Sequence, residues 1–165
     1  PNFEYLGRAT LSDNAAKQYS YSKNTDPIDD TITRMLTISP KGEKNGIFTN
    51  TSTLIIRHSE NNSPEFDVYF NLGSLKHVDF KNYSNRVNVT IRIDKEKSRT
   101  LRWVMSTDRR AVFYDDKRVS FIARLLNAKQ LVLRVSRDSE TDVTAIFDLN
   151  GMGEAIKPMN KFIVE

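Results

Sequence analysis

The chain has 165 residues, a formal net charge of +4 and 38% hydrophobic residues, which fits one domain with a buried core and excludes collagen-like, low-complexity and disordered chains. It contains no cysteine, which excludes disulfides, thiolate nucleophiles, zinc–cysteine sites and iron–sulfur clusters. No stretch approaches the roughly 20 apolar residues of a membrane helix, and the start of the chain has no charged leader followed by an apolar run, so we expect any targeting signal to be absent or removed.

The first half of the chain predicts short β-strands. Runs rich in β-branched and aromatic residues, bounded by turn-forming residues, lie at 17–22, 32–39, 52–58 and 65–71. Residues 1–16 predict an N-terminal arm or a further edge strand. The polar turns between these runs favour antiparallel neighbours.

Stronger strand signals follow in the second half, at 87–94, 101–105, 131–137 and 143–149. The clearest is 87–94, where apolar residues alternate with Asn88, Thr90, Arg92 and Asp94. Such alternation is typical of a strand with one buried and one solvated face. Trp103 alternates with Leu101 and Met105, which favours a place in the core over an exposed stacking platform.

One segment has helical spacing. At 117–127 the residues Val119, Ile122, Ala123 and Leu126 form an apolar stripe, with Asp115 or Asp116 available to cap the helix. A short helical turn at 153–157, ended by Pro158, is also expected. The fold class is therefore mainly β: a single antiparallel β-sandwich or open barrel of about eight to ten strands over residues 1–165, with one amphipathic helix at about 117–127 and a short C-terminal helical turn.

No constellation of catalytic residues is evident. His58 and His77 are the two histidines, no nucleophile elbow is present, and no third metal ligand stands at a recognisable spacing from His58. His58 is expected at the surface, at a strand end. We therefore predict a protein that is not an enzyme, with no catalytic residue, no bound metal and no cofactor.

Three aspartates, Asp26, Asp29 and Asp30, surround a proline before a predicted strand. Two interpretations stay open. The carboxylates either accept hydrogen bonds from backbone N–H groups of the loop or bind a cation, because hard cations favour clustered carboxylates.

Positive charge is concentrated in one region: residues 95–137 carry twelve basic and four acidic side chains. Such a region is either a solvated face or a surface for nucleic acid, an anionic membrane or an acidic protein partner. The candidate binding residues are five arginines: Arg57, Arg92, Arg102, Arg109 and Arg110. Arg57 and Arg92 interrupt apolar strand patterns, so we expect them on a solvated sheet face where they share a patch.

The order of segments resembles a known family. The most specific pieces are Pro27-Ile28-Asp29-Asp30, Arg102-Trp103-Val104-Met105-Ser106-Thr107-Asp108 and Phe147-Asp148-Leu149-Asn150-Gly151. Over about residues 17–163 the chain resembles the VasI/TagO family of type VI secretion-associated proteins. That resemblance implies a small periplasmic or envelope protein with no established catalytic activity and an accessory role.

The chain departs from the family at two positions. The resemblance implies a cysteine where His58 stands and another in the stretch around Lys161 and Phe162, so the implied disulfide is missing. A cysteine-free relative carried by a phage or mobile element and working in the cytoplasm would show the same loss.

These observations predict a non-enzymatic accessory or binding protein that docks a protein or envelope partner. The alternative is a nucleic-acid-binding module, or a phage-encoded host-interaction protein, that uses the basic 95–137 region.

Overall fold

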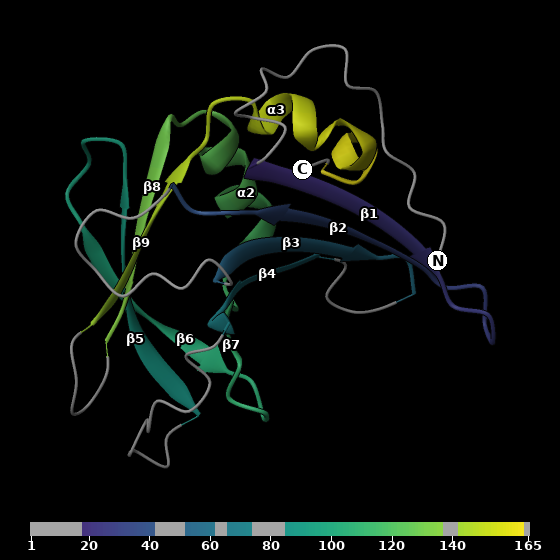
Figure 1. Ribbon diagram of the computed structural model, residues 1–165, viewed down its shortest axis with the longest axis horizontal. Coiled ribbons are helices and arrows are strands. Elements are labelled where there is room, and N and C mark those ends of the chain that lie inside the picture. Colours follow the sequence, from purple (N-terminus) through teal and green to yellow (C-terminus); the bar gives the residue numbers. More distant parts are fainter. Residues whose placement is uncertain (1–17, 42–51, 62–65, 74–84, 137–141, 164–165) are drawn as a thin grey trace.

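The computed structural model describes residues 18–41, 52–61, 66–73, 85–136 and 142–163 (Figure 1). The predicted arm at 1–16, His77 and Arg137 lie outside these ranges. The described residues form nine strands, whose bounds are β1 Tyr19–Thr25, β2 Ile32–Ile38, β3 Thr53–Ser59, β4 Phe66–Asn71, β5 Arg86–Ile93, β6 Arg99–Met105, β7 Ala111–Tyr114, β8 Gln130–Val135 and β9 Val143–Asp148.

All nine strands belong to one open antiparallel sheet with the order β1-β2-β3-β4-β7-β6-β5-β8-β9. The prediction of a mainly β, antiparallel fold with eight to ten strands is confirmed. The sheet is continuous because β7, which the sequence analysis missed, pairs with β4 on one side and with β6 on the other. Its four residues are too few to show an alternating pattern.

The sheet bends so that β1 to β4 form one half and β6, β5, β8 and β9 form the other (Figure 1). The two edge regions meet at one corner. There the Lys41 N–H donates to the Ile146 carbonyl at 2.8 Å, and the Tyr19 hydroxyl donates to the Asp148 carbonyl at 2.7 Å. Among the described residues the result is an open, unclosed barrel whose two edge regions touch at this corner.

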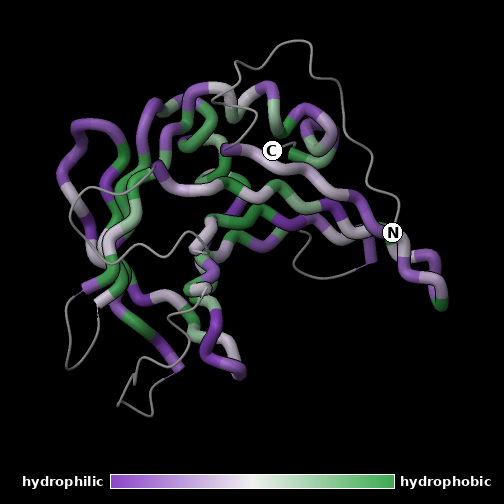
Figure 2. The backbone as a smooth tube through the Cα atoms, in the orientation of Figure 1, coloured by the Kyte–Doolittle hydropathy of each residue, from purple (hydrophilic) through white to green (hydrophobic). Residues whose placement is uncertain are grey.

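The inner face of the bent sheet carries the hydrophobic core. Figure 2 shows hydrophobic stretches along the strands and hydrophilic stretches in the turns. Trp103, Ile91, Leu133 and Phe147 all belong to the same buried cluster, as their alternation predicts. The Trp103 ring meets Phe121 edge-on, with 6.3 Å between ring centroids. Burial of Trp103, at 1% exposure, confirms its place in the core.

Helix α2 (Arg118–Leu126) confirms the predicted amphipathic helix and covers the inner face. Its buried side chains are Phe121, Ile122 and Leu125, so the buried stripe is rotated from the predicted one. Lys117 precedes the helix and no side chain caps it, so the prediction of an aspartate cap is wrong. Asp115 is engaged elsewhere, in an ion pair with Arg86.

Two short helices follow β9: α3 (Met152–Ala155) and the 3-10 helix η2 (Lys157–Phe162). The predicted C-terminal helical turn is present, but Pro158 does not end it. Proline lies at the start of η2, where its missing N–H costs no hydrogen bond. None of the helices in the described ranges has the length and apolar character needed to cross a membrane.

Candidate functional site: an arginine-bearing sheet face

The outer surface of β5, β6 and β8 gathers arginine side chains. Because Val87, Val89 and Ile91 point into the core, the alternate residues of β5 point outward. We call this surface the arginine face and define it by four exposed arginines and three polar neighbours: Arg86, Arg92, Arg102, Arg134, Asn88, Thr90 and Thr100.

Strand register sets the order of these residues. Asn88 of β5 lies opposite Arg102 of β6, and Thr90 of β5 lies opposite Arg134 of β8. Arg102 and Arg134 therefore flank β5 from its two neighbours. The outward positions of these three strands contribute four arginines and no carboxylate, so the face is locally cationic.

Several guanidinium groups of this face are held by hydrogen bonds. Arg86 Nη2 lies 2.7 Å from Asp115 Oδ2, and this hydrogen bond is the main reason why the pKa of the Asp115 carboxyl is lowered. Arg134 Nε donates to the Thr144 hydroxyl at 3.0 Å. A neutral partner such as Thr144 orients the guanidinium without cancelling its charge, which suits capture of a carboxylate.

Arg57 does not join this surface. It lies on β3, four strands from β5 in the sheet order, and strand spacing alone separates the two by about 19 Å. Its Nε donates to Asp67 Oδ2 at 3.0 Å, and its guanidinium lies 5.4 Å from the centroid of the Tyr69 ring. Arg57 and Arg92 share the outer side of the sheet but not a patch.

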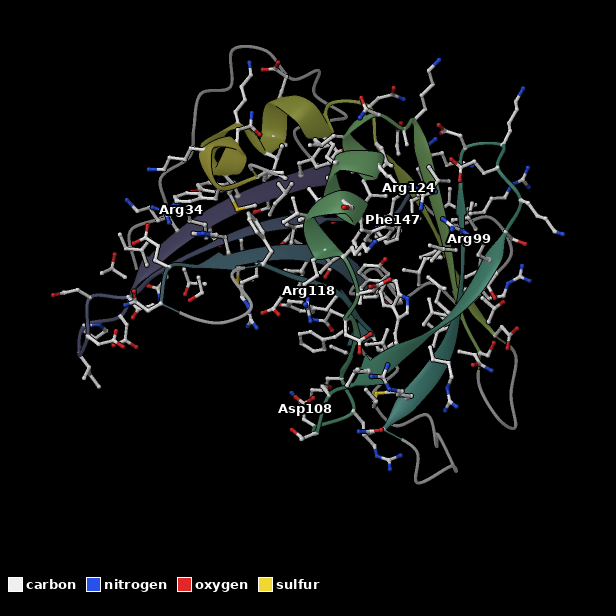
Figure 3. The ribbon with its side chains drawn as sticks, turned by 180° about the vertical axis from the view of Figure 1, so that it is seen from behind. Arg34, Arg99, Asp108, Arg118, Arg124 and Phe147 are labelled. Carbon is white, nitrogen blue, oxygen red and sulfur yellow. The ribbon has the colours of Figure 1, made fainter. Side chains whose placement is uncertain are left out.

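Arg109 and Arg110 lie in the turn between β6 and β7, beyond the rows of the arginine face. Figure 3 labels Asp108 in this turn, whose carboxylate accepts hydrogen bonds from the Ser106 hydroxyl at 2.6 Å and the Arg110 N–H at 3.1 Å. The first of these bonds is the main cause of the lowered pKa of Asp108. Arg109 has a φ of 56°, in the left-handed region. The positions of Arg109 and Arg110 are therefore set by the backbone of the turn and not by the alternation of a strand.

The basic 95–137 segment is not one surface. Arg118 and Arg124 belong to α2, on the inner side of the sheet (Figure 3), whereas Arg102 and Arg134 point outward. Arg124 pairs with Glu96 at 2.7 Å. The sheet itself separates these charges, so residues close in sequence face opposite sides.

Two of the three aspartates in the β1–β2 turn, Asp26 and Asp29, accept hydrogen bonds from backbone N–H groups of the turn. Asp26 Oδ1 accepts from the Ile28 N–H at 2.7 Å, and Asp29 Oδ1 accepts from the Thr31 N–H at 2.9 Å. Asp30 has a φ of 58°, which an aspartate tolerates better than most residues. Within the described ranges, no three acidic, histidine or cysteine side chains converge as metal ligands would.

His58 is buried at 1% exposure, so the prediction of a surface histidine is wrong. The imidazole stacks on Phe162 of η2, with 3.9 Å between ring centroids and 23° between planes. The Arg34 guanidinium lies 4.7 Å from the centroid of the same phenyl ring and pairs with Glu60 at 2.7 Å. No local sequence signal reveals this cluster, because Phe162 is distant in the chain.

The geometry defines the class of protein as an open antiparallel barrel with a cationic outer face. Comparison with known proteins assigns no family to it. The sequence matches no protein-family model and no curated protein. Among solved structures, the fold is similar to invasion associated protein B from Bartonella henselae, with a TM-score of 0.51 and 14% identity over 88% of this chain and 94% of that one. Likeness at this identity shows a shared fold alone.

Proposed function

We propose that this chain is a non-enzymatic accessory protein that docks an acidic surface of a partner protein through the arginine face. The observation that carries the proposal is the placement of Arg86, Arg92, Arg102 and Arg134 on the outer side of three adjacent strands that add no carboxylate there. Guanidinium groups bind carboxylates in bidentate fashion and are common in protein interfaces.

The chemistry of the arginine face favours a protein partner over nucleic acid. The outward residues of β5, β6 and β8 include no aromatic side chain, and single-stranded bases are bound largely by stacking on aromatic rings. Thr90 and Thr100 instead share a hydrogen bond of 2.8 Å between their hydroxyls, so small polar side chains lie between the arginines. A polar and cationic surface without aromatic side chains suits an acidic protein surface.

A second observation supports an accessory role of the VasI/TagO type. That family resemblance implies cysteines at position 58 and at about 161–162. In this chain His58 and Phe162 are in direct ring contact, so the side chains at the two positions point toward each other, as the implied pairing requires. The stacked pair then ties η2 to β3 in a cysteine-free chain.

The test compares two anionic probes, a glutamate-rich peptide and a DNA oligonucleotide, by fluorescence anisotropy over a series of salt concentrations. The Arg92→Gln/Arg102→Gln variant should lower the affinity for the acidic peptide about tenfold, because two charge-assisted contacts are lost. Arg57→Gln is the matched control, because it removes an arginine from the same side of the sheet but outside the arginine face, and it should bind as the wild type does. Tighter binding of DNA, with a steep loss of affinity in salt, would favour the nucleic-acid alternative instead.

A further inference from the structure

We propose that the arginine face of one copy of this chain binds the β1–β2 turn of a second copy. We call this turn, residues 26–31, the acidic tip; it contains Asp26, Pro27, Ile28, Asp29 and Asp30. This inference rests on the proposed function and names the partner. It joins an exposed isoleucine among uncompensated carboxylates, at one end of the molecule, to an excess of arginines at the other.

The acidic tip carries an apolar side chain that the fold leaves in solvent. Ile28 is 92% exposed, whereas Ile146, the other exposed large hydrophobic residue in the described ranges, is 37% exposed. Covering apolar surface is worth about 25 cal/mol for each Å² removed from water. Ile28 therefore offers a partner an apolar contact in the middle of the charges of the tip.

The carboxylates of the acidic tip have no cation to compensate them. Among the residues that the structure describes, none of the three forms an ion pair, whereas Glu60, Asp67 and Asp115 each pair with an arginine. Residues 24–33 contain three aspartates and no basic residue. The hairpin thus ends in a concentrated negative charge that the rest of the fold does not use.

Hydrogen bonds fix the shape of the tip before any partner binds. The Asp26 N–H donates to the Thr31 carbonyl at 2.9 Å, and the Asp30 N–H donates to the Asp26 carbonyl at 3.0 Å. The hydrogen bond from the Thr31 N–H is the main reason why the pKa of the Asp29 carboxyl is lowered. A carboxylate has about four acceptor positions, so each aspartate can still bind a guanidinium. A tip of fixed shape loses little conformational entropy on binding.

The arginine face has the opposite charge in excess. Asp115, the acid beside the face, pairs with Arg86. Four arginines less this one aspartate leave three positive charges, which match the three aspartates of the tip in number. Planar guanidinium groups suit bidentate binding of carboxylates. The two surfaces are therefore complementary in charge.

The arginine face also borders an apolar spot for Ile28. On the outer side of β6, Val104 lies between Arg86 of β5 and Phe113 of β7, and both apolar side chains are partly exposed. Arg102 lies two residues from Val104 on the same strand and therefore on the same side of the sheet. Ile28 can pack on Val104 while its neighbouring aspartates meet these two arginines.

The spacing of the two surfaces agrees. Asp26 and Asp30 lie two residues on either side of Ile28, so their Cα atoms are within about 7 Å of it. Arg86 lies about 5 Å from Val104 across the strands, and Arg102 about 7 Å along the strand. One tip can therefore engage one apolar side chain and both arginines at once.

The tip and the face belong to opposite ends of the molecule. Figure 1 shows the β1–β2 hairpin projecting at one end, with β5 and β6 at the other. The pairing is therefore between copies, and it is a contact between two different surfaces. In a pair of molecules joined by one such contact, one tip and one face remain available.

Sedimentation velocity over a series of protein and salt concentrations measures the association. The wild type should associate reversibly at low salt and dissociate as salt screens the charges. The tip variant Asp26→Asn/Asp29→Asn/Asp30→Asn removes three charges but keeps a side-chain acceptor at each position, and it should raise Kd about tenfold or more. Ile28→Ser should also weaken association, and it leaves the core untouched because Ile28 is exposed.

The face variant Arg86→Gln/Arg102→Gln should weaken association as the tip variant does. Arg57→Gln, on the same side of the sheet but outside the arginine face, is the matched control and should associate as the wild type does. A mixture of the tip variant and the face variant should form a 1:1 complex with the affinity of the wild type, because one intact tip meets one intact face. Circular dichroism checks that each variant is folded, and Ile28→Ser decides the outcome if the triple variant is not.

Two results would overturn the second copy as the partner and leave the proposed function intact. One is a wild type that stays monomeric up to about 1 mM while the glutamate-rich peptide binds. The other is self-association that persists unchanged in the tip variant and in Ile28→Ser, because the contact would then lie elsewhere. Failure of the glutamate-rich peptide to bind, or peptide binding unchanged in Arg92→Gln/Arg102→Gln, would overturn the proposed function itself.

Discussion

The two halves of the bent sheet share one core but differ on their outer surfaces. On β1 to β4 the outward charges of Arg57 and Asp67 compensate each other across adjacent strands. On β5, β6 and β8 the outward positions carry arginines and no carboxylate. The first half is electrically neutral on its outer side, and the second is cationic.

This difference separates charge that is balanced within the outer surface from charge that is in excess there. An arginine paired with an aspartate on a neighbouring strand has little Coulomb attraction left for a ligand, and such surface pairs contribute little to stability. Arg86 of the second half also pairs with Asp115, but the four arginines of the arginine face outnumber this one aspartate, and an excess of arginines raises the local concentration of anions. The outer surface of the second half therefore carries an excess of positive charge.

The largest expected effect tests the shared core. Trp103→Ala should lower the free energy of unfolding by about 3–5 kcal/mol, because it removes a large buried side chain. Arg102→Ala, one residue away on the opposite side of the sheet, should change it by no more than about 0.5 kcal/mol. Urea denaturation followed by circular dichroism measures both, since Trp103 is the single tryptophan. Similar losses for the two variants would show that the faces are not divided as described.

A second, smaller effect concerns the 3-10 helix η2, which packs against the neutral half of the sheet. There Phe162 of η2 contacts His58 of β3. The His58→Cys/Phe162→Cys variant should form an intramolecular disulfide on mild oxidation. The oxidised form should be about 2–4 kcal/mol more stable than the reduced form, because the disulfide closes a long loop in the unfolded chain.

Thiol titration and urea denaturation of the oxidised and reduced forms measure that effect. Each single cysteine variant is a control, because it has no partner cysteine within the chain. A pair that stays reduced would count against the VasI/TagO resemblance.

The smallest expected effect is a pH dependence. The hydrogen bond from Arg34 lowers the pKa of Glu60 from its ordinary 4.5, so ionised Glu60 stabilises the folded state. That contribution is fully present above about pH 4.5 and is lost as the pH falls through the lower, folded-state value. Between neutral pH and pH 3, wild type should therefore lose more stability than Glu60→Gln.

Asp115→Asn tests the same effect in the second half, because the hydrogen bond from Arg86 lowers the pKa of Asp115. It should also flatten the pH dependence of stability in urea denaturation. In addition it releases Arg86, which should strengthen binding of the acidic peptide. Unchanged binding would show that Arg86 does not contribute to the arginine face.

Several features followed from the sequence alone. Period-two alternation predicted four of the nine strands, and β-branched and aromatic composition predicted four more. Alternation also predicted the inward direction of Trp103, because side-chain direction in a strand is a local property of the backbone. Helical spacing located α2 in the same way. Alternation also indicated that Arg92 and Arg102 point outward.

Only the tertiary structure decided which outward residues are neighbours. Sheet order places β7, β6 and β4 between β3 and β5, which separates Arg57 from Arg92, and it places β8 beside β5, which brings Arg134 to the arginine face. The burial of His58 depends on Phe162, a residue far along the chain. Strand order and long-range packing arise from contacts between distant segments, and the local periodicity that defines a strand carries no information about which strand lies next to it.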